Sequence, residues 1–308
     1  MRFLIARLSS LGDVVCSLPA ASTLKAAFPD SEVTWAVDPR FAGVVECCSA
    51  VDVVANTQPL GGQFDAALDL QGLMKSGRII AKAKSPIKLG YHWQREGSWL
   101  FTQPVLPDPT SLHIVDQYVD VARAAVATLG GTSSDGPAEF RISPRAEEVE
   151  EVRTMLEVRG VTGDYVLINP GAGWATKRWP PSHFAKVVDW LWAHDLAPVA
   201  LGGPSEADLA AYNEVAMECL KPPIKMTGET GIQKLIALVA GAKIHIGGDT
   251  GSSHLAAAQG IPAIGLYSIT RPERSCPYGQ FERCLYAREG LSKIEPEHVI
   301  AQIEPLLK

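Results

Sequence analysis

The chain has 308 residues, of which 46% are hydrophobic and 20% are charged, and its formal net charge at pH 7 is -6. These values are ordinary for a globular protein, and the length predicts two domains that each have a core of their own. A net negative charge excludes a protein that binds polyanions such as nucleic acid over its whole surface, although it leaves room for a local basic patch.

Two features of the sequence bear on the compartment of the protein. Its six cysteines include no CxxC pair and no zinc-site spacing, so we expect buried free thiols in a reducing cytoplasm. The apolar N-terminus is interrupted at Arg7, which predicts a first strand and not a signal peptide. No apolar run reaches the roughly 20 residues that a membrane-spanning helix needs. We therefore expect a protein that is cytosolic or peripheral to a membrane.

Apolar segments and turns alternate along the first half of the chain. Residues 2–8 predict a buried strand, and a helix is expected over 14–27. A short helix is expected over 41–48, and further strands are expected over 32–37, 51–55, 64–70 and 88–91. Strands that alternate with helices over short connections predict a parallel sheet covered on both faces. Ligands of such sheets bind beyond the carboxyl ends of the strands.

An acidic residue, Asp13, stands beyond the end of the first strand, directly after Gly12 and at the start of a helix. An acid in this position can simply stabilise the helix, because the helix dipole places partial positive charge at its N-terminus. The functional interpretation is a carboxylate at a ligand site that takes a proton from an attacking hydroxyl group. The residues alone leave both interpretations open.

A basic segment follows the strand that ends near Gln71. Residues 72–95 contain six Lys and Arg and no Asp or Glu, a pattern that is usually a solvated helix face. Within this segment, Lys75 and Arg78 are three residues apart and come directly after the strand end. They are therefore candidates for binding an acidic acceptor.

The domain boundary is expected in a turn-rich region after an apolar helix over 112–129. We place it between residues 130 and 164, and we divide the chain into domains 1–150 and 151–308. The second domain repeats the alternation of strand and helix, with strands expected over 165–169, 198–201, 244–246 and 263–267. Glycine turns follow the first three of these strands, at 171–173, 202–203 and 247–251.

Polar residues at these turns suit a nucleotide diphosphate. Lys177 and Arg178 follow the first turn, although they can also be surface charges. Glu206 follows the second, either as a helix-start acid or as an acceptor of hydrogen bonds from ribose hydroxyls. The third turn leaves backbone N–H groups unpaired at a helix start, where phosphates bind. The alternative for this third turn is an ordinary connection in which residue 249 or 252 is only an N-cap.

Four motifs, in order over nearly the whole chain, resemble those of one family. They are LxxLGDVVCSLPA, NPGAG followed by TKRWP, LGGPSE, and GGDTGSSHLAAAQGIPAIGLY. Together they resemble the bacterial heptosyltransferases of lipopolysaccharide core synthesis, glycosyltransferase family 9, and the last motif is the most specific. The resemblance implies an α/β protein of the GT-B fold, with two Rossmann-like domains whose parallel sheets face a central cleft. The N-terminal domain would bind the acceptor and the C-terminal domain the nucleotide sugar.

The resemblance also implies an activity and roles for particular residues. The family transfers a heptose, with inversion, from ADP-heptose to the lipopolysaccharide inner core on an acceptor of the Kdo-lipid A type. Asp13 resembles the general base, Lys177 the lysine that faces the donor phosphates, and Glu206 the acid that binds the donor ribose. The other donor-binding candidates are Gly173, Thr176, Asp249, Thr250, Gly251 and His254.

Partners and alternatives follow from the same resemblance. The chain has no Asp-x-Asp motif that would hold Mg²⁺ between phosphates, so we expect no metal requirement and no cofactor besides the substrate ADP-heptose. The expected location is the cytoplasm, or the inner face of the inner membrane, where a lipid A-core acceptor lies. Alternatives are a family 9 transferase for another nucleotide sugar or glycan, a sugar-nucleotide epimerase of the same plan, and a nucleotide-sensing module without turnover.

Overall fold

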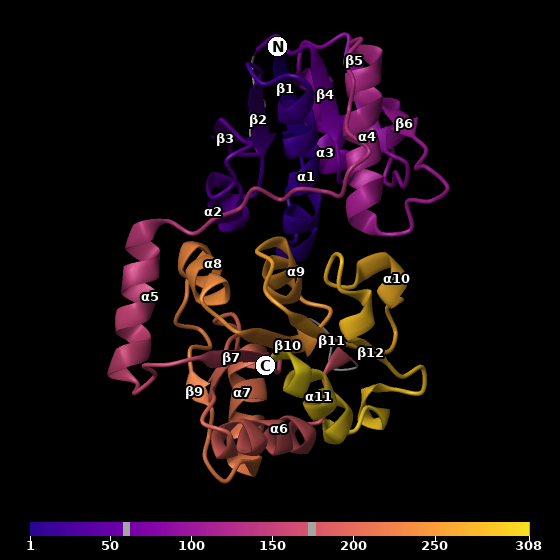
Figure 1. Cartoon of the computed structure of the whole chain (residues 1–308). Helices are drawn as coiled ribbons and strands as arrows, with labels where there is room; N and C mark the ends of the chain where they lie inside the picture. Colours follow the sequence, from indigo (N-terminus) through magenta and orange to yellow (C-terminus); the bar gives the residue numbers. More distant parts are fainter. Residues whose placement is uncertain (58–61, 172–176, 308) are drawn as a thin grey trace. The chain divides into compact units, whose positions relative to one another are not determined.

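The protein is described by a computed structural model that covers residues 1–57, 62–171 and 177–307. The chain divides into two compact units, Met1–Ser143 and Pro144–Lys308. This division falls inside the 130–164 segment, and residues 144–150 belong to the second unit. Each unit contains a sheet of six parallel strands that is flanked by helices (Figure 1). The expectation of two Rossmann-like α/β domains is therefore confirmed.

The sheet of the first unit has the strand order β3-β2-β1-β4-β5-β6. Its strands are β1 (Arg2–Ala6), β2 (Glu32–Ala36), β3 (Val53–Ala55), β4 (Ala66–Asp69), β5 (Ile87–Tyr91) and β6 (Gln103–Val105). The α-helices of the described residues are α1 (Leu11–Ala27), α2 (Ala42–Glu46), α3 (Met74–Lys82) and α4 (Ile114–Thr128). Because β1 pairs with both β2 and β4, the segment after β1 lies in the middle of the carboxyl edge.

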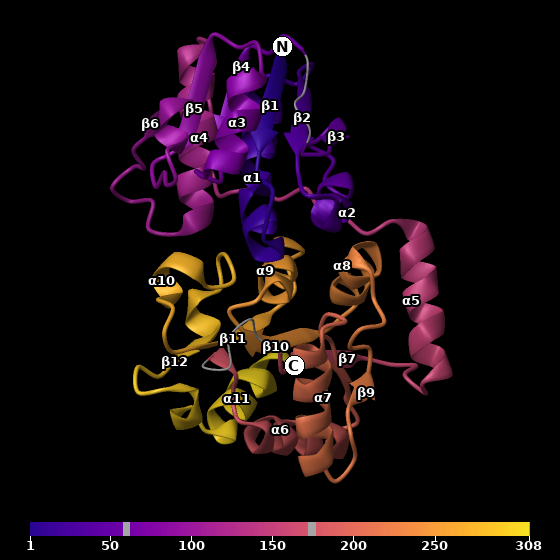
Figure 2. The same ribbon diagram turned by 180° about the vertical axis from the view of Figure 1, so that it is seen from behind.

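Helices cover both faces of this first sheet. α1 packs against α4 on one face, while α3 contacts β1 and β4 from the other, as a comparison of Figure 1 with Figure 2 shows. Helix α1 is buried along most of its length, which explains why it is apolar all round. It begins at Leu11, three residues before the expected start, because Ser10 and Asp13 form a capping box there.

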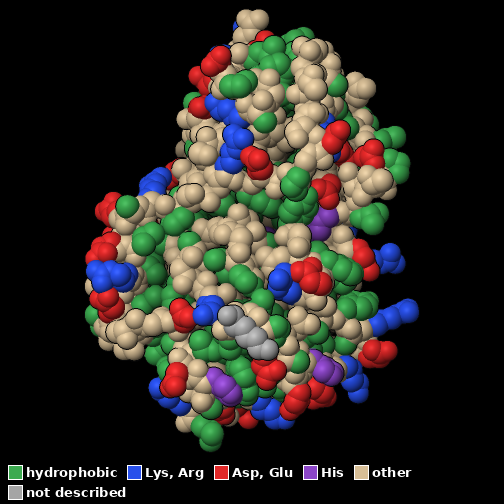
Figure 3. All heavy atoms as spheres, in the orientation of Figure 1, with side chains coloured by type: hydrophobic (Ala, Val, Ile, Leu, Met, Phe, Trp, Pro, Cys, Tyr) green, Lys and Arg blue, Asp and Glu red, His purple; other side chains and the backbone are tan. Residues whose placement is uncertain are grey.

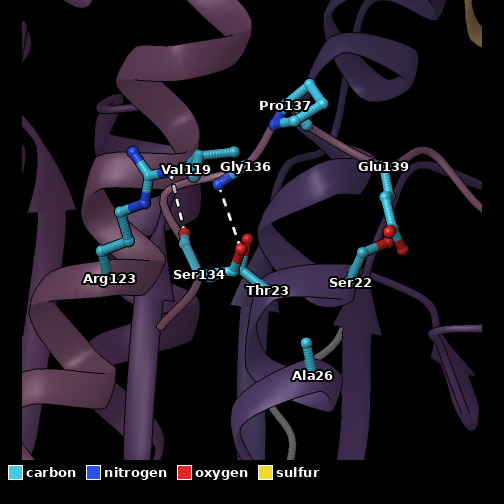
Figure 4. Close-up of a pocket in the computed structure, with 10 residues that line it drawn as sticks. Ser22, Thr23, Ala26, Val119, Arg123, Ser134, Gly136, Pro137 and Glu139 are labelled. Carbon is cyan, nitrogen blue, oxygen red and sulfur yellow. Dashed lines mark hydrogen bonds between the residues drawn. The ribbon is translucent and has the colours of Figure 1, made fainter. Parts of the chain in front are cut away.

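A hollow of about 290 Å³ lies between α1, α4 and the segment 134–139 that leads to the second unit (Figure 4). Arg123 of α4 donates to the carbonyl oxygen of Ser134 at 3.1 Å, and the Gly136 N–H donates to Ser134 Oγ at 3.0 Å. The first bond holds the segment against α4, and the second is a local turn contact within the segment. None of the predicted site residues is found among the described residues that line this hollow.

The sheet of the second unit has the strand order β12-β11-β10-β7-β8-β9. Its strands are β7 (Tyr165–Asn169), β8 (Ala197–Ala200), β9 (Ile224–Lys225), β10 (Ile244–Gly248), β11 (Ala263–Tyr267) and β12 (Cys284–Tyr286). Its α-helices, over the described residues, are α5 (Ala146–Val158), α6 (Pro181–Ala193), α7 (Glu206–Glu218), α8 (Ile232–Ala240), α9 (Gly251–Ala258), α10 (Pro272–Ser275) and α11 (Pro296–Ile303). The register pairs Asn169 of β7 with Gly247 of β10, so the turns after these two strands are neighbours.

The core of the second unit fixes the chain next to Lys177. Trp179 is only 2% exposed, and its indole N–H donates to the carbonyl oxygen of Ile294 at 2.8 Å. Its ring meets the ring of Phe184 edge-on, with 4.8 Å between the centroids. Trp179 is therefore a packing residue, and it anchors the loop that ends two residues before it.

Helix α5, at the start of the second unit, buries Val152 and Leu156, and its exposed face carries both signs of charge. Arg153 pairs with Glu150 and Glu157 one helical turn away on either side, and acidic and basic side chains are interspersed along α5 in Figure 3. This pattern is that of a solvated helix with local ion pairs, and we assign it no part in a ligand site.

The sequence predicted that the chain has no membrane-spanning helix and that its cysteines are buried thiols. Over the ranges that the structure describes, no helix is both long and apolar enough to cross a membrane. The cysteines are all free, with Cys16, Cys47, Cys48 and Cys276 buried and Cys219 and Cys284 half-buried. Burial raises the pKa of Cys48 to about 11, so this thiol stays protonated at neutral pH.

Candidate active site

Asp13 lies in the first turn of α1, in the middle of the carboxyl edge of the first sheet. Ser10 donates twice to its Oδ2 atom, from the backbone N–H at 3.1 Å and from the hydroxyl at 2.9 Å. Nη2 of Arg7 lies 2.7 Å from its Oδ1 atom. The side chain of Asp13 is nevertheless 43% exposed, so its carboxylate is oriented by two neighbours and open to a ligand.

Arg7 is a site residue that the sequence analysis did not identify. Its side chain is only 8% exposed, its Nη1 donates to the carbonyl oxygen of Leu70 at 2.7 Å, and its guanidinium lies over the ring of Tyr118. Burial opposes the charge, but interactions with Tyr118 and Asp13 raise the pKa of Arg7 above its ordinary value. A buried cation needs a counter-charge, and here Asp13 supplies it. The signal in the sequence was one arginine at the end of an apolar strand.

The ends of β1 and β4 are tied together beside this pair. Oδ1 of Asp69, which is fully buried, accepts from the N–H groups of Gln71 and Gly72 at 3.0 and 2.9 Å. Burial raises the pKa of Asp69. The side chain of Gln71 accepts from the Leu8 N–H at 2.8 Å. These bonds fix the two turns from which α1 and α3 start.

Lys75 and Arg78 lie together on the exposed face of α3, as their spacing predicted. Both line a hollow of about 430 Å³, which is also lined by Thr57, Met74, Ile79, Lys82 and Glu96. Three cations and one acid therefore surround a space that can hold a small anionic group. This geometry agrees with an acceptor site and also with a solvated helix face.

The second unit brings three of the predicted residues together. Nζ of Lys177 lies 3.0 Å from Oδ2 of Asp249, and Nε2 of His254 lies 3.4 Å from its Oδ1. Burial alone would raise the pKa of Asp249, but the hydrogen bonds and charges of His254 and Lys177 lower it to about 2. Asp249 therefore joins the loop after β7 to the first turn of α9, and it is ionised at neutral pH.

The turn after β10 offers unused hydrogen-bond donors. Thr250 is the N-cap residue of α9, and Gly251 is the first helical residue. In the described part of the chain, the backbone N–H groups of Thr250, Gly251 and Ser252 donate to no acceptor. A helix N-terminus carries partial positive charge and Lys177 lies beside it, so the turn is suited to bind phosphate.

Glu206 follows the second glycine turn, as its motif predicted, and its role as a ribose ligand stays a prediction. It is exposed in the first turn of α7, where an acid stabilises the helix dipole. A second acid, Asp208, lies against the glycine turns. Its carboxylate oxygens are so close to Gly171 and Gly203 that a Cβ atom at either position would contact them. Asp208 also accepts from the Ser205 hydroxyl at 2.7 Å. The Ser-x-x-Asp spacing was the sequence signal for it.

Two predicted donor-binding residues, Gly173 and Thr176, lie outside the described residues. Gly171, at the start of the same loop, donates its N–H to Oδ1 of Asn169 at 3.1 Å. A search of the described ranges for three or more His, Cys, Asp or Glu side chains placed to hold a metal ion finds no such group.

The sequence profile of glycosyltransferase family 9 (heptosyltransferase) matches residues 53–299. The chain belongs to this family. Among curated proteins, lipopolysaccharide core heptosyltransferase OpsX of Haemophilus influenzae is 25% identical over 300 residues, which cover 92% of this chain and 84% of OpsX. Lipopolysaccharide heptosyltransferase 1 of Escherichia coli is 26% identical over an alignment that covers 99% of this chain and 100% of that protein.

Solved structures show the same fold for this family 9 chain. A family 9 glycosyltransferase from Veillonella parvula has a TM-score of 0.86 at 24% identity and covers 99% of this chain and 97% of that one. E. coli heptosyltransferase WaaC with ADP has a TM-score of 0.80 at 22% identity and covers 99% and 100%. UDP-GlcNAc 2-epimerase from Methanocaldococcus jannaschii is more distant, with a TM-score of 0.53 at 12% identity and coverage of 100% and 93%. The predicted GT-B fold is confirmed, and the protein is a glycosyltransferase.

The interactions of Asp249 with His254 and Lys177 in this glycosyltransferase predict a pH dependence of stability. The pKa of Asp249 falls from 3.8 to about 2 on folding, so its carboxylate stabilises the fold above about pH 4. This contribution, roughly 2 kcal/mol, is lost as the pH falls through about 2. Lys177→Met should raise the pKa of Asp249, as measured by carboxyl ¹³C titration. An unchanged pKa in that variant would show that Lys177 does not stabilise the ionised carboxylate.

Proposed function

We propose that the enzyme transfers a heptose, with inversion at the anomeric carbon, from ADP-heptose to the inner core of lipopolysaccharide on an acceptor of the Kdo-lipid A type. The observation that carries this proposal is a cluster in a family 9 chain. It consists of Lys177, Asp249 and the N–H groups of residues 250–252, which have no acceptor among the described residues. Similarity to E. coli proteins supports it. A curated relative is named lipopolysaccharide heptosyltransferase 1, and the heptosyltransferase WaaC has been solved with ADP and with ADP-2-deoxy-2-fluoro heptose.

In this proposal the donor diphosphate lies at the N-terminus of α9. The bond between the anomeric carbon and the ADP oxygen breaks as the acceptor oxygen attacks, so negative charge grows on the departing diphosphate. Lys177 and the N–H groups of Thr250, Gly251 and Ser252 stabilise that charge in place of a metal ion. Asp249 keeps Lys177 in position, and His254 holds the other oxygen of Asp249.

Asp13 acts as the general base and receives the proton of the attacking acceptor hydroxyl. An inverting transfer needs one base and no nucleophilic side chain, which fits a single oriented carboxylate. Arg7 and Ser10 fix the direction of that carboxylate without covering it. Lys75 and Arg78 bind the anionic groups of the acceptor, and the enzyme works as a peripheral protein at the inner face of the inner membrane.

The direct test supplies ADP-heptose and a heptose-deficient lipid A core, and follows the mass of the acceptor together with ADP release. The proposal expects an acceptor heavier by one heptose and one ADP released per transfer. Transfer only from another nucleotide sugar, or to another glycan, would favour a different family 9 activity. Interconversion of a UDP-sugar without any acceptor would favour an epimerase, and donor binding without turnover would favour a sensing module.

Asp13→Asn should slow turnover by about 10²–10⁴-fold, since the acceptor hydroxyl loses its proton acceptor. The amide leaves the buried Arg7 without its counter-charge, so thermal stability should fall, whereas the affinity of the folded variant for ADP should change little. Ser10→Ala is the matched control, because it removes one hydroxyl contact to Asp13 and leaves the carboxylate. Steady-state rates beside calorimetry of ADP binding measure both effects, and normal turnover in Asp13→Asn would remove this residue from the mechanism.

Gly251→Val and Lys177→Ala should damage different steps. Gly251 is helical, so its lack of a side chain matters here for the close approach of phosphate. Gly251→Val should therefore weaken ADP binding, whereas Lys177→Ala should lower kcat more than donor affinity, because its charge is needed most as ADP leaves. Calorimetry and steady-state rates separate the two. Wild-type ADP affinity and turnover in Gly251→Val would place the donor elsewhere.

Replacing both Lys75 and Arg78 with Ala should raise the acceptor KM and reduce its dependence on salt, while the donor KM stays the same. Lys84→Ala is the control, since Lys84 belongs to the same basic segment but is not among the described residues that line the hollow. If the double variant keeps the acceptor KM of the wild type, α3 simply presents a solvated face.

A further inference from the structure

A chain of buried polar side chains lies directly behind the turn after β10. Nε2 of His245 is 2.9 Å from Oγ of Ser252, which is 3.1 Å from Oγ1 of Thr250. Oγ1 of Thr250 is 3.2 Å from Oγ of Ser253, and this hydroxyl donates to the Gly248 carbonyl oxygen at 2.7 Å. His245 is fully buried in β10, and Ser252 and Ser253 are 3% and 1% exposed.

Asn169, at the end of β7, fixes one boundary of this chain. Its Oδ1 accepts from the Gly171 N–H, so its amide orientation is determined and Nδ2 must be the donor. Nδ2 donates to Oγ of Ser252 at 2.9 Å and to Oγ1 of Thr250 at 3.2 Å. The two strands thus share one polar network at their carboxyl ends.

The hydrogen bond from Ser253 to the Gly248 carbonyl oxygen, at the other end of this row of side chains, fixes the direction of every hydrogen bond. A carbonyl oxygen can only accept, so the Ser253 hydroxyl donates its one proton to the Gly248 carbonyl oxygen. In the contact with Thr250, Ser253 Oγ must therefore be the acceptor. Thr250 then has no proton left, so it accepts from the Ser252 hydroxyl. Ser252 in turn must accept from His245, which therefore carries its proton on Nε2. This is the one assignment that places a hydrogen in each contact.

Saturation of the hydroxyl groups follows from this direction. Ser252 accepts from His245 and Asn169, and Thr250 accepts from Ser252 and Asn169, while each donates its own proton. Neither hydroxyl has a proton or a lone pair left for a ligand. Besides the ammonium of Lys177, the donors that remain around the turn in the described chain are the backbone N–H groups of residues 250–252.

We propose that His245 is a positioning residue, and that its chain of hydroxyls holds the turn so that the donor diphosphate is bound by backbone N–H groups and not by the hydroxyl of Thr250 or Ser252. This inference rests on the proposed function, because it concerns how the same turn binds ADP-heptose. Burial lowers the pKa of His245 to about 3, so the ring stays neutral at physiological pH and has one N–H only. Nδ1 of His245 has no hydrogen-bond partner among the described residues. This agrees with a tautomer in which Nε2 carries the proton and Nδ1 carries only a lone pair.

Variants of the intact chain test the positioning role. His245→Gln can place an amide N–H close to the position of Nε2, whereas His245→Met fills the space without a donor. We expect ADP affinity to fall about tenfold in His245→Met, the effect of one lost net hydrogen bond, and to stay within about threefold in His245→Gln. The donor KM should rise with the dissociation constant, while kcat changes less, since His245 touches neither substrate nor reacting atoms.

A double-mutant cycle and a spectrum distinguish a connected chain from simple packing. Ser252→Ala should weaken ADP binding as His245→Met does, and the double variant should lose little more than either single one, because both break the same chain. The ¹⁵N shifts of His245 should show the neutral Nε2–H tautomer throughout pH 5–8. A proton on Nδ1, additive losses, or wild-type ADP affinity in folded His245→Met would each overturn the inference. Failure of the wild type to bind ADP would instead overturn the proposed function and, with it, this role.

Discussion

The ion pair between Lys177 and Asp249 joins the loop that follows β7 to the turn that follows β10. Both side chains are largely buried, at 24% and 17% exposure, so each charge needs the other and a break would leave one uncompensated. The pair holds a cation beside the N-terminus of α9, where the N–H groups of residues 250–252 have no acceptor among the described residues. A nucleotide diphosphate is the chemical group that such a place attracts, and the adjacent pairing of β7 and β10 makes the place possible.

The first unit uses a similar device for a different purpose. Arg7 is buried beneath the carboxyl edge and pairs with Asp13, which stays open to solvent on its other side. In the second unit Asp249 positions Lys177 for an anionic ligand. In the first unit Arg7 positions Asp13 to accept a proton. In the first unit the neighbouring strand end supplies a backbone group that completes the pairing, the Leu70 carbonyl oxygen.

Sequence analysis predicted the features that depend on local pattern. Apolar runs marked β1, β7 and β10, and their glycine turns marked the ligand edges. The short edge strands β6, β9 and β12 have only two or three residues each, too few to show a periodicity, and Pro104 interrupts the first. Sequence reasoning missed Arg7, Asp208 and His245 because part of each environment comes from another strand end. These are the Leu70 carbonyl oxygen for Arg7, Gly171 for Asp208, and Asn169 for the hydroxyl that His245 contacts. Glu206 was predicted from its place in a motif, and its role stays a prediction.

Amide ¹H–¹⁵N spectra of the full chain, recorded while ADP is added, test whether the backbone of residues 250–252 binds the donor diphosphate. They report on the N–H groups that have no acceptor among the described residues. If these groups bind the diphosphate, the amide signals of Thr250, Gly251 and Ser252 shift strongly and together, with the same dissociation constant as calorimetry. Saturating ADP that leaves these three signals in place, while amides elsewhere move, would contradict binding by this backbone.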